Sequence, residues 1–480
     1  MTKNIKIKLL AAWCFMALQP AIAQNGHKIQ VTIRPFANKF VYLGYHFGNS
    51  KPISDSIKLD KNGTGFFTGK EKLKPGIYLL GYPDKKQYIE LLIEKSQQFA
   101  VIADTANVIS SMVVKNSPEG TVFQSYQKFM EKKAKEVMQL DAKARNTEPN
   151  VQTAINLERK KINDEVTAYR NGIKTKHPGS LLSAIFDALK EPIVPDAKFH
   201  PGGRYDSAYA WYFYKSHYWD GVSFSDERLL RTPVFEPRFD GYFKNIIYPT
   251  VDSIKTEADK ILTIALKNRE MFKFILSKLI DRYINPEFMG QDAVFVHLFE
   301  KYIAPGMADW LNDKQRKYVF DRAYSLMANL VGEKAAPLDL VDSSGNPVPL
   351  YNVKASYTVV CFWDATCGHC KEVVPRVDSI FKAKWKNQDV ALYGVMTDGG
   401  KESWIKYIND NNLSGWIHAY QPDELKKADN DAGRPNFRQL YDIVTTPKLF
   451  LLDKDKRILA KQLTFDQLDD LLQRKISGSK

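Results

Sequence analysis

The stretch of sequence that decides the fold runs from residue 360 to residue 375. It reads Val360-Cys361-Phe362-Trp363-Asp364-Ala365-Thr366-Cys367-Gly368-His369-Cys370-Lys371-Glu372-Val373-Val374-Pro375. Its first part has the composition of a buried strand, and a helix is predicted to start near Cys367 and to run to about Lys384. A Cys-x-x-Cys pair that opens a helix places its first sulfur among unpaired backbone amides, where the helix dipole stabilises a thiolate. We therefore expect Cys367 to be an attacking thiolate.

The two cysteines and the histidine between them form the candidate catalytic site. Cys370 lies one helical turn after Cys367, at about disulfide distance and deeper in the fold. Cys367 is therefore expected to form a mixed disulfide with a client protein, and Cys370 to resolve it. The imidazole of His369 is expected to lower the pKa of Cys367 further.

Other uses of the cysteine pair fit the sequence less well. A structural zinc site needs four ligands, and the sequence has no second Cys-x-x-Cys. Haem attachment needs a histidine directly after Cys370, where Lys371 stands. The sequence also has no nucleotide-binding fingerprint, so no metal and no cofactor are expected. An inert, structural disulfide remains an alternative to redox chemistry.

Strands and helices alternate around this motif, from residue 331 to residue 480, which is typical of an α/β sheet. Strands are predicted over 357–363, 390–395, 416–420, 448–452 and 457–460, the last two as a hairpin. Helices are predicted over 367–384, 401–411 and 464–475. Thr464 and Gln467 have the spacing of a capping box at the start of the last helix.

Several motifs in residues 331–480 match, in order and spacing, those of a known family. They are Ala336-Pro337, Phe362-Trp363, Cys367-Gly-His-Cys370, Pro375 and Thr446-Pro447. The segment resembles exported thioredoxin-like thiol–disulfide oxidoreductases of the TlpA/ResA type, within the AhpC/TSA-redoxin superfamily. The resemblance implies a thioredoxin fold, a cis Pro447 that faces the cysteines, and a Thr446 backbone that pairs with the client peptide. It implies supporting roles for Trp363, His369 and Glu372 as well.

The sequence departs from the family pattern at three positions near the cysteines, one of which is Thr366, where the family usually has Trp before the first Cys. Thioredoxins carry a buried Asp six residues before the first Cys, and here that position is Cys361, which we interpret as an inert core thiol. The glutamate found three residues after the second Cys is here Val373. Glu372 is offset from that position by about 100° around the helix, so its role as a proton relay stays open.

The chain before residue 331 has two different patterns. Residues 24–112 contain short alternating runs, at 28–33, 40–43, 76–80 and 89–93, that are separated by turn residues. They predict a small antiparallel β sandwich, with a hairpin at Asp60–Gly63. Residues 117–330 have helical periodicity interrupted by prolines, which predicts an all-helical domain. The fold class is therefore multidomain α+β, with the thioredoxin fold at the C-terminal end.

One part of the helical region is unusually aromatic. Eight Tyr, Trp and Phe side chains lie between residues 205 and 219. They would fit an aromatic groove that holds unfolded or peptide clients. They would also fit a helix packed on several faces, and we favour that interpretation, with His217 as a structural histidine.

The first 23 residues have the pattern of a signal peptide. Three lysines precede an apolar run, and Ala21-Ile22-Ala23 fits a cleavage site after Ala23. A lipoprotein signal that uses Cys14 is disfavoured because Trp13 stands before it. The protein is therefore expected to be exported to a periplasm.

Charge and composition exclude several classes of protein. The chain has 480 residues and a net charge of +14, but its basic residues are scattered, so nucleic-acid binding is not expected. No apolar stretch of about 18 residues follows the leader, so no integral membrane span is expected.

These patterns predict a periplasmic thiol–disulfide oxidoreductase that exchanges disulfides with client proteins and electrons with an upstream redox protein. We favour a reductase, of the kind that serves cytochrome c maturation or thiol repair. One alternative is an interaction or scaffold protein whose disulfide is structural. Another is a thiol peroxidase, although that chemistry wants a Thr three residues before the attacking Cys, where Asp364 stands.

Overall fold

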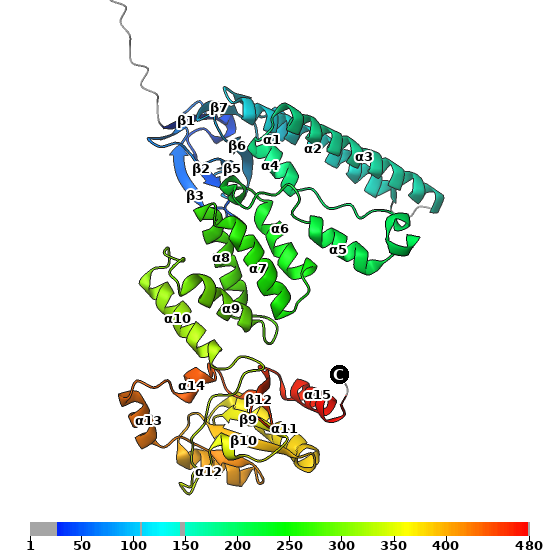
Figure 1. Cartoon of the computed structure of the whole chain (residues 1–480). Helices are drawn as coiled ribbons and strands as arrows, with labels where there is room; N and C mark the ends of the chain where they lie inside the picture. Colours follow the sequence, from blue (N-terminus) through cyan, green and yellow to red (C-terminus); the bar gives the residue numbers. More distant parts are fainter. Residues whose placement is uncertain (1–25, 106–107, 145–148, 479–480) are drawn as a thin grey trace, which may run out of the picture. The chain divides into compact units, whose positions relative to one another are not determined.

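The computed structural model describes residues 26–105, 108–144 and 149–478 (Figure 1). The predicted signal peptide, residues 1–23, lies outside the described residues. The chain divides into two compact units, residues 1–242 and 243–480. The predicted domain boundaries, at residues 24, 112, 117, 330 and 331, stay predictions. In the described part of the chain, no helix is long and apolar enough to cross a membrane.

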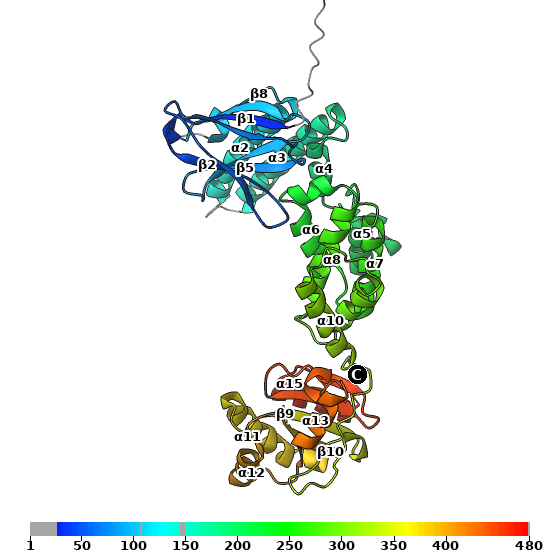
Figure 2. The ribbon, with the colours of Figure 1, turned by 90° about the vertical axis from the view of Figure 1, so that its left-hand side faces the viewer.

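The first unit begins with two four-stranded sheets that enclose one core. One sheet has the order β4-β1-β7-β8 and the other the order β3-β2-β5-β6, and Figure 2 shows β1 and β8 lying over β2 and β5. Alternate residues of the facing strands, such as Ile29, Val31, Val41 and Leu43, point into the core. The strands are β1 His27–Thr32, β2 Phe40–Tyr45, β3 Ile53–Lys58, β4 Thr64–Gly69, β5 Gly76–Gly81, β6 Tyr88–Ile93, β7 Gln98–Ile102 and β8 Val113–Lys115. The predicted sandwich is confirmed, except that β1 and β7 pair in parallel.

The hairpin predicted at Asp60–Gly63 is wrong, although the turn itself is present. The Asp60 carboxylate accepts the backbone N–H groups of Asn62 and Thr64 at 2.8 and 2.9 Å, and Gly63 has a φ of 74°. The turn joins β3 to β4, but β3 pairs with β2 and β4 pairs with β1. Turn chemistry reverses the chain and does not decide which strand becomes a partner, so here it connects the two sheets of the sandwich.

The first unit also contains helices. They are α1 Val108–Ser111, α2 Pro118–Ala144, α3 Pro149–Lys176, α4 Leu181–Ala188, α5 Ser207–His217 and α6 Phe235–Gly241. Residues of α2, α3 and α4 cover the outer face of the sheet that contains β5 and β6. Ile77 and Leu92 of the sheet pack with Phe123 of α2 and with several apolar residues of α4. Figure 1 shows α2 and α3 side by side, and Phe129 stacks on Tyr169 with ring centroids 4.1 Å apart.

The aromatic segment 205–219 is closely packed at its end, where Tyr218 is buried, but its helix α5 is not packed on several faces as we favoured. Its helix α5 is described in full, and Ala210 is the one residue of α5 that is buried. Trp211 and Tyr212 expose 42% and 66% of their surface. His217 does behave as a structural histidine, because its Nδ1 lies 2.9 Å from the Phe213 carbonyl and its ring stacks on Phe213. The error arose because composition shows how much apolar surface a helix has but not which neighbours cover it.

The second unit starts with helices α7 Val251–Ala265, α8 Arg269–Tyr283, α9 Asp292–Leu298 and α10 Asp313–Met327. A π-helical turn, Phe299–Ile303, follows α9 directly. Asn268 caps α8, and Asn312 forms a capping box with Gln315 at the start of α10, so both helix starts are set locally by sequence. In α10, Val319, Ala323 and Leu326 are buried, at the spacing of one helix face.

The C-terminal sheet has the strand order β11-β10-β9-β12-β13. Strands β9, β10 and β11 are parallel, whereas β12 is antiparallel to both β9 and β13. The strands are β9 Tyr357–Trp363, β10 Val390–Met396, β11 Ile417–Ala419, β12 Lys448–Asp453 and β13 Ile458–Lys461. The helices are α11 Gly368–Ala383, α12 Lys401–Asp410, α13 Asp423–Asp431, α14 Phe437–Leu440 and α15 Phe465–Ile476. The predicted α/β domain is confirmed, and α13 and α14 are additions that the sequence did not predict.

Both faces of this sheet are buried, which explains the continuous apolar runs of its strands. Val359, Cys361 and Trp363 of β9 face the core that α11, α12 and α15 complete. Val360 and Phe362 face a second core, which includes α14 and the chain around Leu350. Figure 2 shows α11 and α12 beside β9 and β10. The Cys-x-x-Cys pair follows β9 directly, so the buried strand fixes where α11 begins.

Candidate active site

Cys367 is the N-cap residue of α11. Its sulfur therefore lies at the N-terminal end of the helix, as the sequence predicted. Its backbone is extended, with φ −69° and ψ 125°, and its side chain accepts the backbone N–H of Cys370 at 3.4 Å. The sulfur therefore lies against the unpaired amides at the positive end of the helix dipole. Cys367 is partly exposed and Cys370 is 1% exposed, and both are free thiols.

The surroundings of the two sulfurs push their pKa values in opposite directions. Partial burial tends to raise the pKa of Cys367, but hydrogen bonds from Cys370, Thr446 and the backbone of His369 outweigh it and hold this pKa below its ordinary value. Burial raises the pKa of Cys370 to about 11. Cys367 is thus the better nucleophile near neutral pH, and Cys370 holds its proton.

The loop between β9 and α11 also contacts the pair. The backbone N–H of Asp364 points at the sulfur of Cys370, with a separation of 3.5 Å. The Asp364 carboxylate accepts the N–H and the hydroxyl of Thr366 at 2.7 and 2.8 Å. Asp364 therefore holds the loop in a turn and supplies a donor to the resolving sulfur. The sequence analysis gave Asp364 no such role, although an Asp two residues before a Thr is a recognisable turn signal.

Thr446 and Pro447 lie opposite the cysteines, as the family resemblance implied. The peptide bond between them is cis. The Thr446 carbonyl lies 3.6 Å from the sulfur of Cys367 and accepts its thiol hydrogen. A client sulfur bonded to Cys367 would thus be next to the backbone of residue 446.

His369 and Glu372 are both at the surface of α11. Their side chains are 68% and 74% exposed, and the His369 Nδ1 lies 3.6 Å from a Glu372 carboxylate oxygen. The group of His369 that contacts the Cys367 sulfur is its backbone N–H. The expected effect of the His369 imidazole on the pKa of Cys367 stays a prediction, as does a relay role for Glu372.

Trp363 and Cys361 lie beneath the site. Both are fully buried in the core that α11 completes, and the Trp363 ring packs against Tyr407 at 5.4 Å. Burial raises the pKa of Cys361 well above its usual range, with a smaller contribution from Cys370. These properties agree with an inert core thiol. Trp363 supports the start of α11 by packing.

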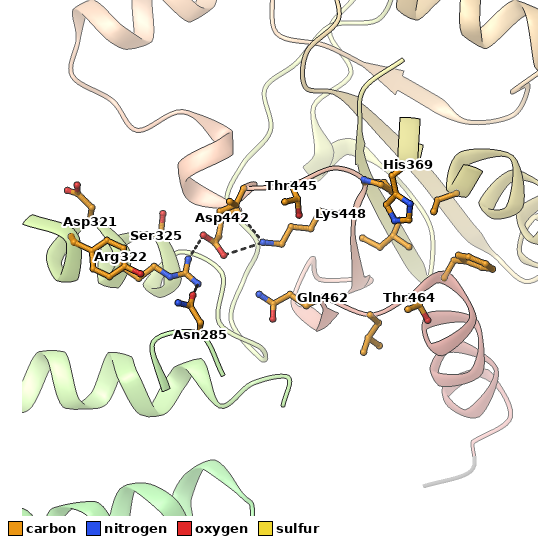
Figure 3. A pocket seen from close by; sticks show the side chains of 17 residues that line it. Asn285, Asp321, Arg322, Ser325, His369, Asp442, Thr445, Lys448, Gln462 and Thr464 are labelled. Carbon is orange, nitrogen blue, oxygen red and sulfur yellow. Dashed lines mark hydrogen bonds and ion pairs between the residues drawn. The ribbon is translucent and has the colours of Figure 1, made fainter. Parts of the chain in front are cut away.

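A cavity of about 930 Å³ opens beside the cysteine pair, and we call it the site cavity (Figure 3). It is lined by three groups of residues: His369 and Val373 of α11; residues of α10 together with Asn285, which follows α8; and residues from the loop before β12, the start of β12 and the segment from the end of β13 to the start of α15. The lining residues are Asn285, Tyr318, Asp321, Arg322, Ser325, His369, Val373, Asp442, Val444, Thr445, Pro447, Lys448, Leu449, Gln462, Leu463, Thr464 and Phe465.

A charged network forms part of the lining of the site cavity. The Arg322 guanidinium and the Lys448 ammonium both donate to the Asp442 carboxylate, the latter at 3.2 Å (Figure 3). Arg322 also donates to the Asn285 amide oxygen at 3.0 Å. Burial lowers the pKa of Lys448, and the Asp442 carboxylate opposes that shift. The sequence analysis missed this network, because no local pattern connects Arg322 to Asp442.

The described residues contain no group of three or more His, Cys, Asp and Glu side chains placed to hold a metal ion. A thiolate at a helix N-terminus, a protonated thiol one turn away, and a nearby peptide carbonyl together suit disulfide exchange.

Comparison with known proteins identifies two families along the chain. The thioredoxin-like family model matches residues 355–458. The model of a domain of unknown function (DUF5106) matches residues 150–328. No curated protein matches the chain at a significant level.

Several solved structures are similar to parts of the chain. A domain of a possible thiol-disulfide isomerase from Cytophaga hutchinsonii is 32% identical over 31% of this chain and 95% of its own, with a TM-score of 0.27. A thiol:disulfide interchange protein from Bacteroides sp. is 29% identical over 32% of this chain and 95% of its own, with a TM-score of 0.28. A thioredoxin-like protein from Bacteroides caccae is 20% identical over 59% of this chain and 97% of its own, with a TM-score of 0.44.

The thioredoxin-like model covers the strand β9 and the helix α11, which lie on either side of Cys367 and hold Cys370. The chain therefore contains a thioredoxin-like domain of the kind found in thiol–disulfide oxidoreductases, preceded by additional N-terminal domains.

Proposed function

We propose that the chain is a periplasmic reductase that transfers electrons from Cys367 and Cys370 to the disulfides of client proteins. The observation that carries the proposal is the contrast between the two sulfurs. Cys367 is accessible and its pKa is lowered, whereas Cys370 is buried and burial raises its pKa to about 11. That arrangement suits one attacking and one resolving thiol.

The exchange can be written with all bonds balanced. The Cys367 thiolate attacks one sulfur of a client disulfide, forms a mixed disulfide and releases the other client sulfur as a thiolate. Cys370 then loses its proton to solvent and attacks the Cys367 sulfur, which releases the second client thiolate. Two electrons have passed to the client, and Cys367 and Cys370 are joined as a disulfide. An upstream dithiol protein must reduce this disulfide before the next cycle.

The two pKa shifts also bear on the direction of the reaction. Strong oxidants of this fold owe their potential to a strongly stabilised thiolate in the reduced form. Here the lowered pKa of Cys367 is accompanied by a raised pKa of Cys370, which disfavours a second negative charge at the site. The preference for a reductase therefore rests on the resemblance of residues 331–480 to reducing members of the family. The predicted leader, residues 1–23, supports a periplasmic location.

The reduction potential of the pair tests the direction. The full chain is equilibrated with glutathione buffers, and the reduced fraction is measured by thiol alkylation and mass spectrometry. We expect a potential near or below about −250 mV. A value of about −120 to −180 mV would mean an oxidase or isomerase. The double variant Cys367→Ser/Cys370→Ser is the control for alkylation at other sites.

Client trapping tests whether the pair reacts with proteins at all. Cys370→Ser removes the resolving thiol, so client proteins should remain bound to Cys367 as mixed disulfides that reducing agents release. Absence of such adducts from periplasmic extracts would favour a scaffold with a structural disulfide. The identity of the trapped clients distinguishes cytochrome c maturation from general thiol repair. Peroxide turnover faster than that of a free thiol would instead favour a peroxidase.

A further inference from the structure

We infer that helix α10, which lies outside the thioredoxin fold, forms one wall of the client-binding groove and selects polypeptide disulfides over low-mass disulfides. The inference rests on the proposed function, since it names the substrate class of the same two cysteines. It assigns Tyr318 of α10 to contact with the client segment that flanks the reacting cysteine.

The first argument is the position of the site cavity. Its lining begins at His369 and Val373 on α11 and continues to Tyr318 and Arg322 on α10. Figure 3 shows the labelled residues of α10 and of α11 on opposite sides of the cavity. A chain segment that follows a cysteine bonded to Cys367 can therefore run along the cavity and reach α10.

The second argument is that hydrogen bonds attach this wall to α14 and to the following loop, which carries Thr446 and Pro447. Arg322 donates to the Asp442 carboxylate, and the Ser325 hydroxyl donates to the Gln439 carbonyl at 2.7 Å. One turn further on, the Asn329 amide donates to the Leu440 carbonyl at 3.0 Å. A preformed wall costs less ordering entropy when a client binds than a mobile one would.

A buried ion pair strengthens that attachment. The Lys461 ammonium, at the end of β13, donates to the Asp292 carboxylate of α9 and to the Asn329 carbonyl at 2.7 Å. The side chains of Lys461 and Asp292 are 1% and 4% exposed. The ion pair therefore holds α9 and the segment after α10 against the sheet. Removing either charge would leave the other buried and unpaired.

The third argument is the chemistry of the lining. Apolar side chains next to Thr445 and α15 remain accessible, and Val444 exposes 77% of its surface. The amides of Asn285 and Gln462 and the hydroxyl of Tyr318 line the same cavity and can bond to a peptide backbone. A mixed lining of about 930 Å³ suits an extended polypeptide segment with apolar side chains. A low-mass disulfide would engage the cysteine end of the cavity alone.

Two tyrosines of α10 provide a matched test. Tyr318 is 54% exposed and lines the site cavity, whereas Tyr324 is 60% exposed, lies outside its lining and packs against Phe299 and Phe320. The full chain and the variants Tyr318→Ala and Tyr324→Ala are assayed with insulin and with oxidised glutathione. The measured quantity is the ratio of the two kcat/KM values, insulin over glutathione.

We expect the ratio to fall about tenfold in Tyr318→Ala, mainly through KM for insulin, and to stay unchanged in Tyr324→Ala. Asp321→Trp should lower the ratio as well, because it fills the cavity from the exposed side of α10, and Lys317→Trp, on the same helix and outside the lining, is its control. An unchanged ratio in both Tyr318→Ala and Asp321→Trp would overturn the inference, as would an equal fall in the control variants. A wild-type chain that reduces neither substrate would contradict the proposed function instead.

Discussion

The site cavity has two walls of different origin. One wall, with His369 and Val373, belongs to the first turns of α11 and lies next in sequence to Cys367. The other wall belongs to α10 and to the loop before β12, where Arg322 and Asp442 are joined across 120 residues of sequence. The cysteine pair is therefore a local motif, whereas the cavity beside it is assembled by packing between segments that are distant in sequence.

The largest expected effect comes from the local wall. Cys367→Ser removes the attacking sulfur, so disulfide exchange with both insulin and oxidised glutathione should fall to the rate measured without protein. Single-turnover alkylation assays on the full chain measure this loss. Cys361→Ala is the matched control, because it removes a fully buried thiol of the same strand and helix core; its activity should stay within about twofold, at a cost of about 1–2 kcal/mol in stability. Residual exchange by Cys367→Ser would contradict the assignment of the nucleophile.

The next effect concerns the attachment of the long-range wall. Lys461→Ala leaves the Asp292 carboxylate buried without its cation, which should lower the free energy of unfolding of this unit by about 3–5 kcal/mol. Urea denaturation, monitored through hydrogen exchange of the backbone amides in α9 and β13, measures this loss of stability. In the double variant Lys461→Met/Asp292→Leu no charge is left unpaired, so most of the stability should return. If the double variant were as unstable as the single one, packing of the Lys461 side chain rather than its charge would be responsible.

A smaller effect is a pH dependence that belongs to the resolving thiol. The pKa of Cys370 is raised to about 11 in the fold, whereas an unfolded Cys titrates near about 8.5. Between these two values the unfolded chain has lost the proton and the folded chain has kept it, so stability of the reduced protein should fall as pH rises, by about 3 kcal/mol in total. Urea midpoints at several pH values measure it. In Cys370→Ala this part of the pH dependence should disappear.

The smallest expected effect is at the start of α15, beside the same cavity. Thr464 accepts the N–H of Gln467, and the Gln467 side chain accepts the N–H of Thr464. Thr464→Ala should therefore cost about 1 kcal/mol, measured by urea denaturation. Thr464→Ser keeps the cap and should cost much less. Equal losses in the two variants would mean that the Thr464 methyl, and not its hydroxyl, stabilises the helix start.

The parts of the fold that sequence reasoning predicted well are those with strong local signals. β9, α11 and the capping box of α15 were predicted because their apolar runs, the Cys-x-x-Cys motif and the Thr464–Gln467 spacing each act within a few residues. The Asp60–Gly63 turn was predicted for the same reason. Its pairing was predicted wrongly, because the partner strands of β3 and β4 are chosen by the stacking of two sheets.

Helices α5 and α10 show that the sequence also contained little information about which helix lies at the candidate site. The aromatic residues of α5 attracted attention in the sequence, yet in the structure Ala210 is the one buried residue of that helix. The sequence of α10 has no comparable signal, yet its Tyr318, Arg322 and Ser325 line the site cavity. Composition describes what a helix could contact, but it does not place the helix beside the chemistry.

The thioredoxin-like domain could be predicted from the sequence alone, and the roles of Cys367 as attacking thiol and Cys370 as resolving thiol are predictions from the same motif. Each depends on groups within one strand and one helical turn, whose spacing is set by covalent geometry and the helix dipole. The sequence did not predict that α10 and Pro447 line the same cavity, or that Arg322, Asp442 and Lys448 share one network; both arise from the tertiary structure. Those contacts arise when distant segments bury their charges and apolar faces together, and no local pattern in the chain encodes which segments will meet.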